Sequence, residues 1–234
     1  MTTAPLPPAI PEHVAELIIV GGTFDPPHLA HTKLPVEARA AAALDSSWLL
    51  FIPAARSPLK DLSPRASDND RLAMLELAIE AIPQSSIWDD ELARSRLSHA
   101  PSYTIDTLHR LLQCIAKPPA RPPKLRLLLG TDQALAFHRW REPREILKLA
   151  PPLVMLRGTD ASPFLEALKQ TSFWTERELQ IWANSIVSIS RSDISSTRVR
   201  SLLEAGSEAA SAELASCIAP AVLHYIQTRG LYHR

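Results

Sequence analysis

The 234-residue chain is poor in glycine and in cysteine, and it has no excess of charge of either sign. It has 6 glycines, 2 cysteines, and 25 basic side chains against 25 acidic ones. This balance gives no electrostatic reason to expect binding to nucleic acid or to a membrane surface. Cys114 and Cys217 are too few for a disulfide framework, and neither belongs to a CxxC pair. The small number of cysteines excludes a scaffold held together by disulfide bonds and fits a cytoplasmic protein.

Long apolar runs are also missing. No run approaches the roughly 20 residues of a membrane-spanning helix. The first residues, MTTAPLPPAIPEH, show neither the basic region nor the apolar core of a secretory signal. We interpret residues 1–15 as a flexible, proline-rich leader. Because 46% of all residues are hydrophobic, residues 16–234 can bury the core of a single domain.

Short apolar runs alternate along the chain with stretches of helical periodicity. The alternation predicts right-handed βαβ units and therefore an α/β fold, a doubly wound parallel sheet with a helical C-terminal end. The predicted strands, buried on both faces, are 16–20, 47–53, 125–130, 153–157 and 185–190, with a weaker one at 85–90. The predicted helices are 31–44, 68–82, 103–116, 142–150, 195–205 and 211–228.

The segment GGTFDPPHLAH, residues 21–31, directly follows the first predicted strand. Gly21 and Gly22 lack a Cβ atom, so main-chain N–H groups there can approach a phosphate at the ligand-binding edge of the sheet. His28 and His31 share one face if a helix begins near His28, and a helix N-terminus attracts anions. Alone, an HxxH pair is more often a surface accident than a site. The spacing does not match the HExxH of a zinc protease, and the chain has no GxGxxG or P-loop motif.

A second helix start follows the last predicted strand, in ISRSDISSTRVRSLLEAG, residues 189–206. Hydroxyl and guanidinium groups in one first turn form an anion site, although the segment alone also fits an ordinary capped helix. Two such helix starts at one sheet edge predict a nucleoside triphosphate held at two points. They favour a phosphoryl or nucleotidyl transfer assisted by charge stabilisation. The side chains concerned are Ser195, Thr197, Arg198 and Arg200.

With these two motifs the chain resembles the nicotinate-nucleotide adenylyltransferase family. The family belongs to a nucleotidyltransferase group with HxGH after the first strand and SxTxxR near the C-terminus. Four further segments look like this family: RLAMLELAI (71–79), PSYTIDTL (101–108), LLGTDQALAFHRW (128–140) and VLHYIQTRGLY (222–232). The likeness implies a Rossmann-like fold and transfer of the adenylyl group of ATP to nicotinate mononucleotide in NAD biosynthesis. Mg²⁺ would enter with ATP, with no metal site formed by protein side chains, and the protein would be a monomer or a homodimer.

The resemblance also implies roles for individual residues. His28, His31 and Arg200 would be the catalytic residues, acting on the ATP phosphates. Main-chain and side-chain groups around ATP would come from Gly21, Gly22, Thr23, Phe24, Lys60, Ser195 and Thr197. The nicotinate mononucleotide would be bound by Tyr103, Thr104, Asp132, Trp140 and Arg141. For several of these a purely structural role is an alternative, with Trp140 in the core, Asp132 as a helix cap, and Tyr103 and Thr104 merely starting a helix.

Three positions depart from the family pattern. Ala30 replaces the glycine of HxGH, Leu59 replaces a histidine of the loop that carries Lys60, and Arg141 replaces a second aromatic residue. Within the enzyme class, an adenylyltransferase for nicotinamide mononucleotide, or for both acceptors, stays open. From another class, a nucleotide-binding sensor without catalysis is the alternative.

Overall fold

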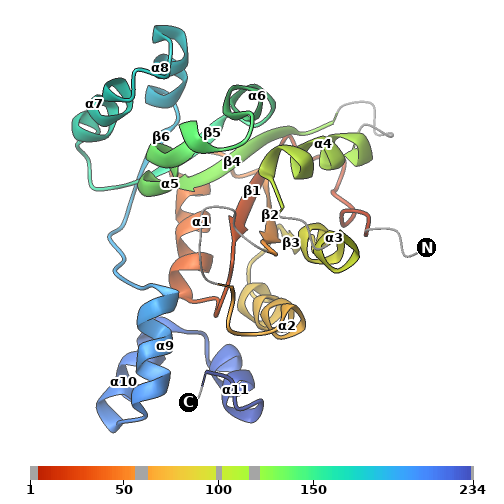
Figure 1. Cartoon of the computed structure of the whole chain (residues 1–234), viewed down its shortest axis with the longest axis vertical. Coiled ribbons are helices and arrows are strands. Elements are labelled where there is room, and N and C mark those ends of the chain that lie inside the picture. The colour runs from red at the N-terminus through yellow and green to blue at the C-terminus, as the bar shows by residue number, and fades with distance from the viewer. Residues whose placement is uncertain (1–4, 56–62, 99–101, 116–121, 233–234) are drawn as a thin grey trace.

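In the computed structural model, six parallel strands form one sheet in the order β3-β2-β1-β4-β5-β6 (Figure 1). The structure describes residues 5–55, 63–98, 102–115 and 122–232. The first three strands of the chain form one half of the sheet and the last three form the other half. The direction in which strands are added therefore reverses between β1 and β4. Ligands of doubly wound proteins bind at such a reversal. The strands are β1 (Glu16–Gly22), β2 (Trp48–Pro53), β3 (Ser85–Ile87), β4 (Lys124–Gly130), β5 (Pro152–Arg157) and β6 (Ile186–Ile189).

The predicted α/β fold and its parallel sheet are confirmed, and most predicted helices are present. The helix predicted over 211–228 is wrong, because two helices occupy this range. Ile218 is extended, and Pro220, which cannot continue a helix, begins a new one. The helices are α1 (Leu29–Ala41), α2 (Asp68–Ile79), α3 (Asp90–Ser98), α4 (Thr104–Ile115), α5 (Thr131–Ala136), α6 (Pro143–Leu149), α7 (Ser162–Gln170), α8 (Glu176–Ala183), α9 (Ser196–Ala205), α10 (Glu208–Cys217) and α11 (Pro220–Thr228), with a 3-10 turn at Phe137–Arg139.

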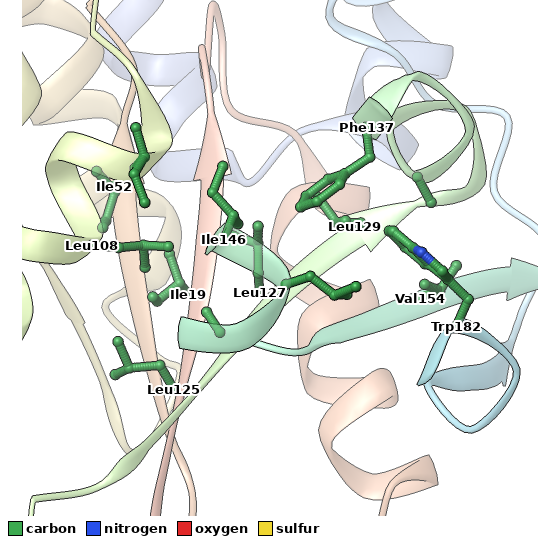
Figure 2. Close-up of a cluster of buried hydrophobic side chains, with 14 of the residues drawn as sticks. Ile19, Ile52, Leu108, Leu125, Leu127, Leu129, Phe137, Ile146, Val154 and Trp182 are labelled. Atoms are coloured by element: carbon green, nitrogen blue, oxygen red, sulfur yellow. The ribbon is translucent and has the colours of Figure 1, made fainter. Parts of the chain in front are cut away.

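Apolar side chains fill both faces of the sheet, which explains why the strands are apolar throughout. Successive strand residues point to opposite faces, so Ile19 belongs to the cluster under α4 to α8 and Ile18 to the cluster under α1 and α2. Figure 2 shows part of the first cluster, where Leu129 of β4 lies beside Phe137 and Val154 of β5 lies beside Trp182. The sheet is thus a rigid layer between two layers of helices.

A third cluster lies away from the sheet and joins α9, α10 and α11 to Met74 of α2. In Figure 1 these three helices lie together, at the opposite end of the molecule from α7 and α8. At the other terminus, Val14 is buried and Trp88 Nε1 donates to the carbonyl oxygen of Pro5 at 3.1 Å. Residues 5–15 therefore contact the rest of the protein, and the proposed division of the chain at residue 15 stays a prediction.

Candidate functional site

The loop between β1 and α1 has an unusual main-chain course. Phe24 has a φ of 51°, in the left-handed region that residues other than glycine seldom adopt. Its ring lies over Gly22, where an added Cβ atom would approach the ring to 2.8 Å. Gly22 is therefore required by the packing of Phe24, whereas a Cβ atom at Gly21 would meet open space. The second glycine shapes the loop, and the first leaves the main chain open to a ligand.

The two predicted histidines lie side by side at the N-terminus of α1. His28 is the N-cap residue, and its N–H donates to Nδ1 of His31 at 3.2 Å. The imidazole rings stack with centroids 3.7 Å apart, and the ring of Phe24 meets His31 edge-on at 5.1 Å. His28 is only 6% exposed, and burial lowers its pKa from 6.5 to about 4. At neutral pH His28 is thus uncharged, and its Nδ1 is buried without a partner among the described residues.

The second motif contacts the first directly, although about 170 residues separate them. Ser195 caps α9 by accepting the N–H of Arg198 at 3.2 Å. Ser196 Oγ donates to the carbonyl oxygen of Pro26 at 3.0 Å. Arg200 Nη1 donates to the carbonyl oxygen of Asp25 at 2.6 Å, and its Nη2 donates to Thr197 Oγ1 at 3.3 Å. Both helix starts therefore belong to one site.

Arg198 points away from this site, toward α10. Its Nε and Nη2 form a bidentate ion pair with Glu213 at 2.8 and 2.6 Å. Arg200, in contrast, lies against the loop after β1. The two arginines of one helix turn thus differ in their contacts: Arg198 pairs with α10, and Arg200 contacts the loop that leads to His28.

Two charged residues that the sequence reasoning did not single out hold this loop. The side chain of Arg71 is fully buried, and its Nη1 donates to the carbonyl oxygens of Thr23 and Ala54, both at 2.7 Å. Asp25 is 5% exposed and accepts three hydrogen bonds from other segments. The sequence did contain a signal for both residues: Arg71 begins the otherwise apolar stretch RLAMLELAI, and Asp25 lies inside the first motif.

The residues predicted to bind the acceptor, here called the acceptor side, lie at the start of α4 and in the segment that follows the carboxyl end of β4. The Arg141 guanidinium lies over the ring of Tyr103, 4.9 Å from its centroid. Trp140 packs on Phe137 with ring centroids 4.8 Å apart, and its Nε1 is buried without a partner among the described residues. Asp132 is exposed in the first turn of α5, whose N-cap is Gly130, so its alternative role as a helix cap is wrong. Thr104 begins α4.

Next to Tyr103, charged groups of α3 and α4 form a cluster around two buried carboxylates, Asp90 and Glu91. Thr107 Oγ1 donates to Glu91 Oε1 at 2.9 Å and accepts from Arg94 Nη2 at 2.8 Å. Asp90 pairs with Arg94 Nε at 2.7 Å and with Arg110 Nε at 2.8 Å. Burial, opposed by Thr107 and Arg94, raises the pKa of Glu91 from 4.5 to about 7.

The structure describes only some of the remaining positions that the sequence singled out. Lys60 and Leu59 lie outside the described residues. Ala30 is half-buried in the first turn of α1. Among the described residues, no group of three or more His, Cys, Asp or Glu side chains could hold a metal ion. The helices in the described ranges include none that is long and apolar enough to cross a membrane.

Comparisons with known proteins agree with this fold and identify the family. A family model described as cytidylyltransferase-like matches residues 19–202. A protein of Aquifex aeolicus named "Probable nicotinate-nucleotide adenylyltransferase" is 40% identical over 153 residues, 65% of this chain and 84% of that protein. A protein of the same name from Rhodopirellula baltica is 36% identical over 188 residues, 80% of this chain and 82% of that protein. The solved Plasmodium falciparum nicotinic acid mononucleotide adenylyltransferase complexed with NaAD has the same fold, with a TM-score of 0.63 at 19% identity over 93% of this chain and 97% of that one.

Proposed function

Because the chain belongs to the cytidylyltransferase-like family and, within it, to the nicotinate-nucleotide adenylyltransferases, we propose that it transfers the adenylyl group of ATP to nicotinate mononucleotide. The products are deamido-NAD and pyrophosphate, a step of NAD biosynthesis. The observation that carries this proposal is the contact between the two motifs, where Arg200 and Ser196 bind carbonyl oxygens of the loop that leads to His28. This contact forms one anion site from two helix N-termini. A reducing cytoplasm stays our expectation for the compartment, since Cys114 and Cys217 are both free.

The reaction requires no nucleophile from the protein. An oxygen of the mononucleotide phosphate forms a bond to the α-phosphorus of ATP, while the bond from that phosphorus to the bridging oxygen breaks. Pyrophosphate leaves with the electron pair. The protein contributes position and charge stabilisation, which are the main sources of catalysis in such transfers.

The phosphate side supplies donors of two kinds. Arg200 supplies a guanidinium group, whereas His28 is neutral and acts as a hydrogen-bond donor. Main-chain N–H groups at Gly21 and at the start of α1, with the hydroxyls of Ser195 and Thr197, complete the set. Mg²⁺, bound by the phosphates and water, would neutralise part of the triphosphate charge. The carboxylate of Asp25 does not suit a metal, because three protein donors already use its oxygens.

The acceptor side supplies flat groups and an exposed cation. We propose that the pyridine ring of the acceptor stacks near Tyr103 and Trp140, and that Arg141 and the N–H groups at the start of α4 face its carboxylate. We propose that Asp132, which is exposed in the first turn of α5, accepts a hydrogen bond from a ribose hydroxyl. Selection of the acid over the amide follows from these donors, because an amide carries no charge for Arg141 to meet.

The direct test is release of pyrophosphate from ATP and Mg²⁺, measured with nicotinate mononucleotide and with nicotinamide mononucleotide as acceptors. We expect a higher kcat/KM with the acid. A preference for the amide would favour the alternative acceptor, and no release with either acceptor would favour a nucleotide-binding sensor.

The histidine pair gives a second test. His28→Ala removes a preorganised donor, and we expect kcat to fall by about 10²- to 10³-fold. His224→Ala, which changes an exposed histidine of α11, is the matched control and should keep kcat near the wild-type value. Near-normal turnover of the His28 variant would overturn the role assigned to this residue.

A further inference from the structure

The Asp25 carboxylate is fully engaged by donors from distant segments. Its Oδ2 accepts the N–H of Arg65 at 2.8 Å, and its Oδ1 accepts the N–H of Ala66 at 3.1 Å. The third donor is the hydroxyl of Tyr232, which lies 2.7 Å from Oδ1 and comes from the C-terminal end of the described chain. A buried carboxylate requires such partners, because leaving its charge unpaired is costly.

Arg200 approaches the same residue by a different atom. Its Nη1 lies 2.6 Å from the main-chain oxygen of Asp25 but 3.8 Å from the carboxylate Oδ2. The side chain of Arg200 is 22% exposed, so it is not closed off from solvent. If the carboxylate lost a donor, its charge would attract Arg200 more strongly. A closer ion pair would then turn the guanidinium away from the triphosphate.

Tyr232 is well suited to keep the Asp25 carboxylate from drawing Arg200 closer. Its side chain is 8% exposed in the cluster formed by α9 to α11. Burial and the neighbouring Asp25 raise the pKa of the phenol well above its usual value, so the hydroxyl remains a donor at physiological pH. Its main chain has a φ of 65°, a left-handed conformation that is costly for a residue with a large side chain. Tyr232 adopts this left-handed conformation in the same arrangement in which its hydroxyl donates to Asp25.

We propose that Tyr232 is a positioning residue for the transfer reaction: its hydroxyl satisfies Asp25, which keeps the guanidinium of Arg200 directed at the triphosphate. This inference rests on the proposed function. It gives the residues that follow α11 a part in placing Arg200, in addition to their packing against α9 to α11.

The chain offers a matched control for the test. Tyr225 of α11 belongs to the same cluster, and its hydroxyl donates to another buried aspartate, Asp70, at 2.9 Å. Tyr225→Phe and Tyr232→Phe each delete one hydroxyl bonded to a carboxylate, but only Asp25 contacts Arg200. We expect Tyr232→Phe to lower kcat/KM for ATP by about tenfold, as the loss of one charge-assisted hydrogen bond does. KM for nicotinate mononucleotide and the kinetics of Tyr225→Phe should stay within about twofold of wild type.

Melting temperatures of both variants separate positioning from folding. Equal losses of stability with unequal losses of kcat/KM support the proposal, whereas activity losses that follow stability in both variants overturn it. A double-mutant cycle adds an independent readout: in the Arg200→Ala background, Tyr232→Phe should have no further effect on kcat/KM. Additive effects would show that the hydroxyl acts without Arg200.

The same variants distinguish this proposal from the proposed function. If the wild-type protein releases no pyrophosphate, the proposed function fails, and the dissociation constant for ATP then tests the positioning. Tyr232→Phe should weaken ATP binding and Tyr225→Phe should not. Equal ATP affinities of the two variants would overturn the role of Tyr232.

Discussion

The two sides of the site differ in how far the protein itself completes them. On the phosphate side, His28 and Asp25 are almost fully buried, and Arg71 and Arg200 bind main-chain oxygens of the same loop. On the acceptor side, Asp132 and Arg141 are exposed and Trp140 Nε1 has no partner among the described residues. The charged groups of the phosphate side are thus buried and paired within the chain, whereas those of the acceptor side are exposed, and each side has one ring nitrogen, His28 Nδ1 or Trp140 Nε1, without a partner among the described residues.

The difference in burial fits the ligand that we propose for each side. Charge that develops on phosphates during the reaction is stabilised best by donors that need no reorganisation. Fixing those donors requires buried charged groups, and each of these needs partners of its own. A neutral ring with one carboxylate is bound by flat side chains and an exposed cation, which need less support.

The largest expected effect tests whether the phosphate side is the catalytic one. Arg200→Ala removes a permanent positive charge from the triphosphate, and we expect kcat/KM for ATP to fall by about 10²- to 10³-fold. Arg198→Ala in the same helix breaks only the exposed pair with Glu213, so its kcat/KM should stay within about threefold of wild type. Steady-state kinetics check both. Similar losses in the two variants would mean that α9 acts only through its stability.

Much of this comparison could be predicted from the sequence, because its signals are local. The strands are uninterrupted apolar runs, and the two helix starts have hydroxyls, histidines and arginines at helical spacing. The contact of Tyr232 with Asp25 joins residues 207 apart, and only the folded chain brings them together. The break between α10 and α11 had a local signal in Pro220, but the apolar periodicity on either side of it outweighed that signal.

Two buried groups, one on each side, give opposite dependences of stability on pH. His28 has a pKa of about 4 in the folded state and 6.5 ordinarily, so only the unfolded chain binds the proton between these values. Stability therefore falls as pH decreases from 6.5 to 4, by about 3 kcal/mol in all. Glu91 has a pKa of about 7 in the folded state and 4.5 ordinarily, so the folded chain binds the proton. Stability then falls as pH rises from 4.5 to 7, by a similar amount.

In the wild-type protein these two contributions largely cancel, and variants should separate them. We expect Glu91→Gln to make stability decrease more steeply on acidification than in wild type, and His28→Asn to do the reverse. Urea denaturation across this pH range gives the slopes. Glu208→Gln, which changes an exposed carboxylate of α10, is the control and should leave the slope unchanged. Slopes that shift in the same direction for Glu91→Gln and His28→Asn would contradict the assigned protonation states.

The smallest expected effect concerns Arg141, the exposed cation of the acceptor side. It lies over the Tyr103 ring and 3.8 Å from Asp106, so a ligand carboxylate must compete with an existing partner. We expect Arg141→Ala to raise KM for nicotinate mononucleotide by about two- to fivefold, the scale of one exposed cation contact, and to leave KM for ATP unchanged. Arg139→Ala, two residues away and also exposed, should change neither constant. The proposed contact of Arg141 with a carboxylate predicts that its loss reduces kcat/KM for the acid more than for the amide. An equal reduction of kcat/KM for both acceptors would mean that Arg141 acts by packing on Tyr103. The acceptor side would then be held by contacts within the protein, as the phosphate side is.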